Sequence, residues 1–153
     1  MRRLALAAGV ALAVSATASG AEKVMVQVMT IRASGDPKGA APIFDAELAG
    51  LRAMLGAAYG GYRHYEYVEL LTRRSSLKAP VDFALKPGPT VSITVEEFKN
   101  GRFTAVVEIF RGNKRVGKTK IMGREGVYSF VALSSNPRKK ELIVVAFKVT
   151  KAR

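Results

Sequence analysis

The only histidine in the chain, His64, is the first place to look for chemistry, because the sequence contains no cysteine. A zinc centre would need several carboxylates around this imidazole, and no H-x-x-x-H spacing is present. A Ser–His–acid triad would rely on a G-x-S-x-G elbow, which the sequence also lacks. We therefore predict no catalytic residue, no metal site and no cofactor.

Glu96, Glu97 and Glu108 are the carboxylates best suited to acid–base chemistry on a polysaccharide. Such hydrolysis needs two carboxyl groups at a defined separation across one bond. Glu96 and Glu97 are neighbours in a predicted strand, so their side chains point to opposite faces. A protein without enzymatic activity is the leading hypothesis, and a polysaccharide-acting enzyme that uses these three residues is a less favoured alternative.

An aromatic cluster surrounds the histidine and consists of Tyr62, His64, Tyr65 and Tyr67. Exposed rings beside an arginine such as Arg63 bind sugars or bases, because stacking and hydrogen bonding then act together. Tyr65 and Tyr67 are two residues apart and would share one face of a strand. The cluster is a candidate binding surface. The alternative is that the rings pack at the edge of a core with their hydroxyl groups in water.

The charge of the chain is its most unusual bulk property: 25 Lys and Arg stand against 12 Asp and Glu, a net charge of +13. Such a field attracts polyanions through counterion release, although many basic proteins merely solvate their charge. The basic residues are concentrated late in the chain. We predict one patch that binds an anion or an acidic partner and contains Lys114, Arg115, Lys118, Lys120, Arg138, Lys139 and Lys140.

The first 21 residues are typical of a cleavable signal peptide, which predicts a periplasmic or secreted protein. Arg2 and Arg3 precede the uncharged run 4–14, and small residues end at Ala21. The apolar run is shorter than the roughly 20 residues that a membrane anchor needs, so we expect no transmembrane anchor. Residues 22–153 then form a single basic domain. Losing the two arginines lowers its net charge from +13 to +11.

Hydrophobic periodicity predicts a mainly β domain with one helix, an α+β fold. Leu48, Leu51, Met54 and Leu55 recur at helical spacing in 45–58, with Asp45 as the N-cap and Gly60-Gly61 as the end. About eight strands with tight turns indicate an antiparallel β-sandwich or a curved sheet, with the helix packed on one side or end. The predicted strands are 23–31, 62–73, 81–85, 91–98, 103–110, 114–122, 127–133 and 142–149.

Two of these strands, 23–31 and 142–149, are apolar on both faces, so we expect them to pair at the centre of a sheet. The lysine-rich strand 114–120 should lie at an edge, where lysine guards against the addition of a further strand. The strands from 91 to 133 are expected to form one antiparallel meander. The free domain should be a monomer, and a partner strand would approach the less charged edge near 81–85.

Several positions along the domain carry a resemblance to a known family: Ile31-Arg32-Ala33-Ser34, Asp45, Leu48, Leu51, Leu55, Tyr62, Tyr65, Leu85, Gly88 and 142–144. In these residues the chain resembles short exported envelope proteins of myxobacteria and related bacteria. The resemblance implies a subunit of a cell-envelope assembly and brings no catalytic residues. The leading hypothesis is therefore a binding or scaffold domain of an envelope protein complex. The alternative is a binder of an anionic envelope polymer, either polysaccharide or lipopolysaccharide; cytoplasmic nucleic acid is not expected.

Overall fold

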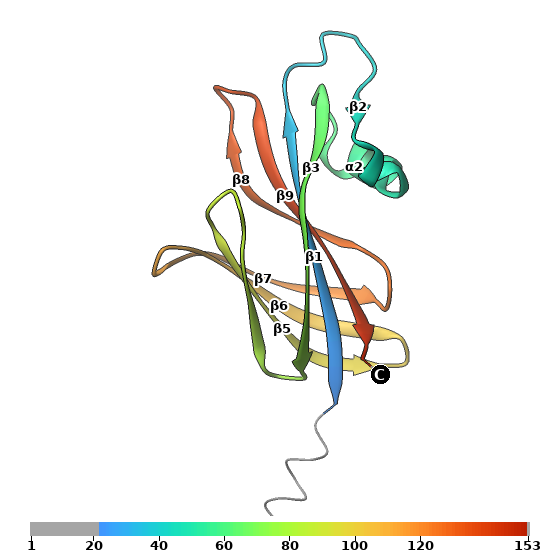
Figure 1. Cartoon of the computed structure of the whole chain (residues 1–153), viewed down its shortest axis with the longest axis vertical. Helices are drawn as coiled ribbons and strands as arrows, with labels where there is room; N and C mark the ends of the chain where they lie inside the picture. The colour runs from blue at the N-terminus through green and yellow to red at the C-terminus, as the bar shows by residue number, and fades with distance from the viewer. Residues whose placement is uncertain (1–21, 153) are drawn as a thin grey trace, which may run out of the picture.

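The computed structural model describes residues 22–152, and these residues form a β-sandwich with one α-helix, as predicted (Figure 1). The predicted signal peptide, residues 1–21, lies outside the described residues. Within 22–152, no helix has the length and apolar character needed to cross a membrane. The elements are β1 (Lys23–Ser34), β2 (Ile43–Phe44), the 3₁₀ helix η2 (Ala46–Leu51), α2 (Arg52–Tyr59), β3 (His64–Ser76), β4 (Pro80–Ala84), β5 (Thr90–Lys99), β6 (Arg102–Arg111), β7 (Lys114–Arg124), β8 (Ser129–Asn136) and β9 (Glu141–Lys151).

The strands divide into two sheets whose order confirms the expected centre and edge. Sheet A has five strands in the order β2-β3-β1-β9-β8, and sheet B has four in the order β4-β5-β6-β7. The two-sided apolar strands β1 and β9 pair antiparallel at the centre of sheet A, with Val26 opposite Val149. The cationic strand β7 lies at an edge of sheet B.

The first hydrophobic core fills the space between the two sheets. Val24, Val26 and Val28 point into it from β1 and are fully buried. The rings of Phe103 on β6 and Phe147 on β9 meet across it with centroids 6.0 Å apart. Alternate residues of β5 and β6 also face inward, which leaves the other face of sheet B directed away from sheet A.

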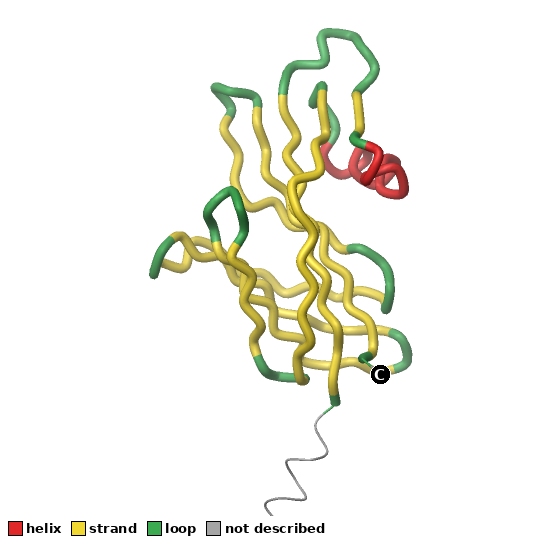
Figure 2. The backbone as a smooth tube through the Cα atoms, in the orientation of Figure 1, coloured by secondary structure: helices red, strands yellow, loops and turns green. Residues whose placement is uncertain are grey.

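The second core lies on the opposite face of sheet A, under the helical segment (Figure 2). Ile31 and Ala33 contribute from β1, and Leu48, Leu51 and Leu55 contribute from η2 and α2. Sheet A is therefore covered on one face by sheet B, along residues 24–28 of β1, and on the opposite face by the helical segment, along residues 29–33. Strands that are apolar on both faces require such cover on both. All buried residues of the two cores lie between 24 and 149.

The predicted helix over 45–58 is broken into two parts. Asp45 occupies the N-cap position, as predicted, whereas the assignment of Met54 to the buried face is wrong. A 3₁₀ helix over Ala46–Leu51 precedes α2, which ends at Tyr59, directly before Gly60-Gly61 as predicted. Asp45 makes no side-chain cap, because its carboxylate is turned toward β3. Met54 is 38% exposed, since the change of helix type rotates it away from the buried face.

The predicted meander is also incomplete, because β8 leaves sheet B and pairs with β9 in sheet A. A strand's alternation shows which of its faces is apolar and does not show which sheet it joins. The turn between β5 and β6 is confirmed: Asn100 and Gly101 both have positive φ, 55° and 73°. A ninth strand, β2, has only two residues, too few to show a pattern.

Candidate anion-binding site

The candidate site lies on the outer face of sheet B, which carries none of the helical cover that sheet A has (Figure 1). On β6, Phe103, Ala105, Val107 and Ile109 face the first core. The residues between them therefore point outward. This outer face carries charged side chains from β5, β6 and β7, and register decides which of them meet.

Three cations occupy matching register positions on three adjacent strands at one end of this face. Lys99 on β5 pairs in register with Arg102 on β6, and Arg102 pairs with Arg124 on β7. Like charges in directly opposite positions destabilise a sheet. Among residues 22–152, none of these three side chains forms an ion pair with a carboxylate. We call Lys99, Arg102 and Arg124 the cationic row.

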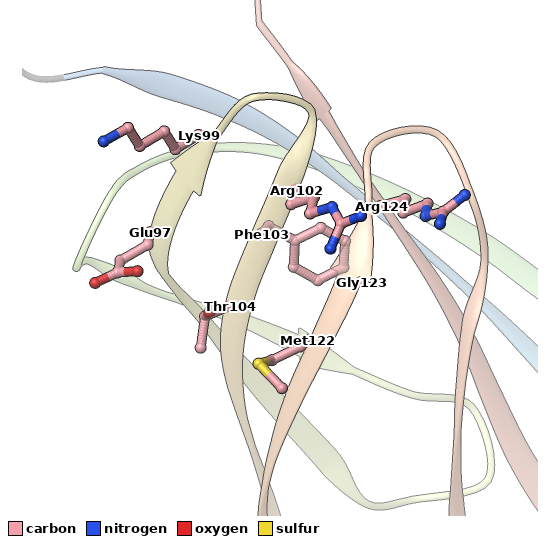
Figure 3. A pocket seen from close by; sticks show the side chains of 8 residues that line it. All are labelled: Glu97, Lys99, Arg102, Phe103, Thr104, Met122, Gly123 and Arg124. Carbon is pink, nitrogen blue, oxygen red and sulfur yellow. The ribbon is translucent and has the colours of Figure 1, made fainter.

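The cationic row borders a pocket of about 380 Å³ whose lining is partly apolar (Figure 3). The lining includes the exposed Met122, Gly123 and the carboxylate of Glu97, together with Phe103, whose ring is buried and faces the first core. Gly123 lies opposite Phe103, and a Cβ atom there would stand 2.5 Å from Cζ of the ring. Glycine is therefore needed for the ring to lie across β7. The pocket offers positive charge beside an apolar surface.

Two other cations on the outer face form ion pairs. Nη1 of Arg115 donates to Oε2 of Glu108 at 3.0 Å, and Nζ of Lys120 lies 3.4 Å from Oε1 of Glu96. Lys118 stands in register opposite Glu108. The cationic row differs from this part of the sheet in having no such compensation.

The seven basic residues predicted from the sequence lie on different sheets. Lys114, Arg115, Lys118 and Lys120 are on β7 in sheet B. Arg138, Lys139 and Lys140 lie in the turn between β8 and β9 in sheet A, where Lys140 O accepts a hydrogen bond from Gly35 N at 2.9 Å. The structure therefore brings together the residues within each group and assigns the two groups to separate sheets.

Sequence reasoning missed the cationic row itself. Lys99 and Arg102 flank the predicted Asn100-Gly101 turn, so they could have been recognised as an opposed pair at the end of a hairpin. Arg124 was not recognisable, because a one-residue shift between Ile109 and Phe110 sets the register of β7 against β6. The length of a turn does not reveal such a bulge.

The predicted aromatic cluster is mostly structural. Tyr65 is 1% exposed, stacks on Phe44 with centroids 4.5 Å apart and donates its hydroxyl hydrogen to Tyr59 O at 2.7 Å. Tyr62 and Tyr67 are partly buried against the second core. Tyr65 is thus wrong as an exposed binding residue, because the helical segment covers this face. Burial raises the pKa of the Tyr65 hydroxyl.

The histidine takes part in fastening the helical segment to β3. Nε2 of His64 lies 2.9 Å from Oδ1 of Asp45, and Oδ2 of Asp45 accepts a hydrogen bond from Tyr67 N at 2.8 Å. These contacts, that of His64 first, hold the pKa of the Asp45 carboxyl below its ordinary value. We refer to this arrangement as the Asp45 clasp.

The candidate acid–base residues do not meet in a tyrosine-lined cleft. Glu96 and Glu97 lie at a bulge of β5 and Glu108 lies on β6. Glu108 does share a pocket of about 480 Å³ with Asp82, on opposite sides of Ser92, and that pocket is lined by no tyrosine. Within 22–152, no three His, Asp or Glu side chains are grouped as metal ligands would be.

Comparisons with models of known protein families and with curated protein sequences find no match for the chain.

Proposed function

We propose that the chain is a periplasmic or secreted binding domain, without enzymatic activity, that docks on an anionic polymer of the cell envelope through the outer face of sheet B. The observation that carries this proposal is the cationic row of Lys99, Arg102 and Arg124, opposed in register and without ion pairs among the described residues. The predicted signal peptide and the resemblance to exported envelope proteins support the location.

The energetics of the cationic row favour an anionic ligand. Three like charges on neighbouring strands repel one another, and an anion placed between them removes that repulsion and adds charge-assisted hydrogen bonds. The two arginines present planar forks that match carboxylate, sulfate or phosphate groups. A polyanion also releases its condensed counterions when these cations replace them, so its binding weakens steeply as salt rises.

A salt series on residues 22–153 with sulfated dextran tests the proposal. We expect the slope of log K against log salt to become shallower by about one for each cation removed, so by about two for the Arg102→Gln, Arg124→Gln double variant. The matched control is Arg138→Gln with Lys139→Gln, which removes equal charge from the turn on sheet A. Equal losses in both double variants would show that bulk charge, and no site on sheet B, attracts the polymer.

A second candidate function, a subunit of an envelope protein assembly, is favoured by the free edge of β4. This strand contains no Lys or Arg, whereas β7 at the opposite edge contains five. Leu85 N donates to Pro89 O toward β5, so by alternation the N–H groups of Asp82 and Ala84 point away from β5. Such an edge can accept a strand from a partner protein.

Asp82→Pro tests this second candidate without touching the core, because Asp82 is exposed and its N–H is outside the ladder with β5. Asp82→Ala is the control for loss of the side chain. Strand addition predicts that a pull-down from envelope extract loses its partner with Asp82→Pro and keeps it with Asp82→Ala. Capture by the folded proline variant would rule out docking at this edge.

A further inference from the structure

The pocket beside the cationic row contains an apolar side chain that a soluble polyanion would leave in water. Met122 is 82% exposed, and it lies on β7 two residues from Arg124 and two from Lys120 on the same face. Arg102 stands opposite Arg124 on β6, so cations border the methionine on two strands. A flexible thioether flanked by Arg124 and Lys120 is suited to a ligand that is both anionic and apolar.

Further exposed apolar side chains lie along the same edge. Val116 in β7 and Val127, three residues after its end, are each 48% exposed. With Met122, they make up three of the six large hydrophobic residues that are exposed among the described residues. Strand β7, which carries Val116 and Met122, has five cations and no carboxylate. Exposed apolar and cationic side chains are thus concentrated on this edge strand and just after its end.

Among the anions of the cell envelope, this combination fits one that is carried by a lipid better than one that offers no apolar surface, and better than a partner strand. Cations that flank projecting apolar residues bind anionic headgroups while the apolar side chains enter the boundary with the acyl chains. Lysine on an edge strand opposes the pairing of a further strand. A polysaccharide would satisfy the cations and give nothing to Met122.

We propose that the outer face of sheet B, at β7 and its pocket, docks on an anionic lipid surface, with the cationic row at the phosphate groups and Met122 inserted at the headgroup–acyl boundary. This inference rests on the proposed anion binding and names the kind of anion, one that is carried by a lipid. The complementary charge of the row and the exposure of Met122 are the observations that support it.

The absence of tryptophan from the sequence allows a direct test. In residues 22–153, Met122→Trp provides a single reporter at the proposed contact, and Ile43→Trp provides a matched reporter at an exposed apolar position on β2 of sheet A. With vesicles of phosphatidylcholine and phosphatidylglycerol, we expect a blue shift of emission for Met122→Trp and none for Ile43→Trp. Phosphatidylcholine vesicles and sulfated dextran should shift neither.

Flotation with the same vesicles measures how much Met122 and the two arginines of the cationic row each contribute to vesicle binding. Met122→Gln should weaken binding to the anionic vesicles by about tenfold, because burying a methionine side chain contributes on that order, and should leave dextran binding unchanged. Arg102→Gln with Arg124→Gln should weaken both. Excess inorganic phosphate should compete only weakly, since it offers no apolar surface.

The outcomes separate this inference from the proposed function. If Met122→Gln floats like the unaltered chain and binds dextran normally, lipid insertion is overturned and anion binding stands. Complete competition by inorganic phosphate would likewise overturn the lipid-borne ligand while leaving anion binding intact. If the unaltered chain binds neither vesicles nor dextran at low salt, both proposals fall.

Discussion

The two outer faces of the sandwich differ in what they do with residues capable of chemistry. On sheet A, η2 and α2 cover the face, and Asp45, His64 and Tyr65 are engaged in holding that cover. On sheet B, no described element covers the face, and the cationic row is left opposed and unpaired. Side chains on the covered face are explained by folding, whereas the opposed charges of the cationic row are unfavourable for folding.

The largest effect should come from removing the anchor of the cover on sheet A. Leu55 on α2 is fully buried in the second core. Leu55→Ala should lower the free energy of unfolding by about 2–5 kcal/mol, because it removes buried methyl groups and leaves a cavity. Urea denaturation measures the change. Met54→Ala, at the exposed neighbouring position, is the control and should be close to neutral; equal losses would mean that the helix has no preferred face.

A smaller loss of stability is expected at Gly123, which lines the pocket on sheet B and packs against the ring of Phe103. Gly123→Ala places a Cβ atom where the ring of Phe103 lies, and should cost about 1–3 kcal/mol in overpacking. At Gly117, on the same strand, an added Cβ would meet Ile109 at 3.4 Å, an ordinary contact. Gly117→Ala should therefore change the unfolding midpoint far less. If Gly123→Ala leaves the free energy of unfolding unchanged, the ring of Phe103 is free to move away from β7.

The cationic row itself should yield a gain in stability when its repulsion is removed. Arg102→Glu puts a carboxylate between Lys99 and Arg124 and should raise the free energy of unfolding by about 0.2–1 kcal/mol at low salt, less at high salt. Lys118→Glu, opposite Glu108, should do the reverse. The same Arg102→Glu variant should lose polyanion binding. If Arg102→Glu instead lowers the free energy of unfolding, the cationic row stabilises the fold. The proposed difference between the outer faces of sheets A and B would then be wrong.

The sequence predicted the fold class and the central strands, but it did not predict which sheet β8 joins or where the candidate site lies. The two-sided apolar pattern of β1 and β9 predicted their central pairing, because burial on both faces leaves few alternatives. The cationic row depends on cross-strand register, which a bulge between Ile109 and Phe110 shifts by one residue. The role of Tyr65 depends on which face of sheet A the helical segment covers. Hydrophobic periodicity does not predict that placement.

The smallest effect concerns pH and the Asp45 clasp on sheet A. Contacts with His64 and Tyr67 N lower the pKa of the Asp45 carboxyl below its ordinary value of 3.8. A carboxyl with a depressed pKa in the folded state stabilises the fold above the unfolded pKa, and this contribution is lost as the pH falls from about 4 through the lowered value. The side chains of His64 and Asp45 are 38% and 30% exposed, so solvent screens the interaction and we expect at most a few tenths of a kcal/mol. Asp45→Asn should remove that part of the acid destabilisation between pH 5 and pH 2 in urea midpoints. The control, Asp36→Asn in the loop after β1, should retain this acid destabilisation. If Asp45→Asn and the unaltered chain have identical pH profiles, the Asp45 clasp has no electrostatic component.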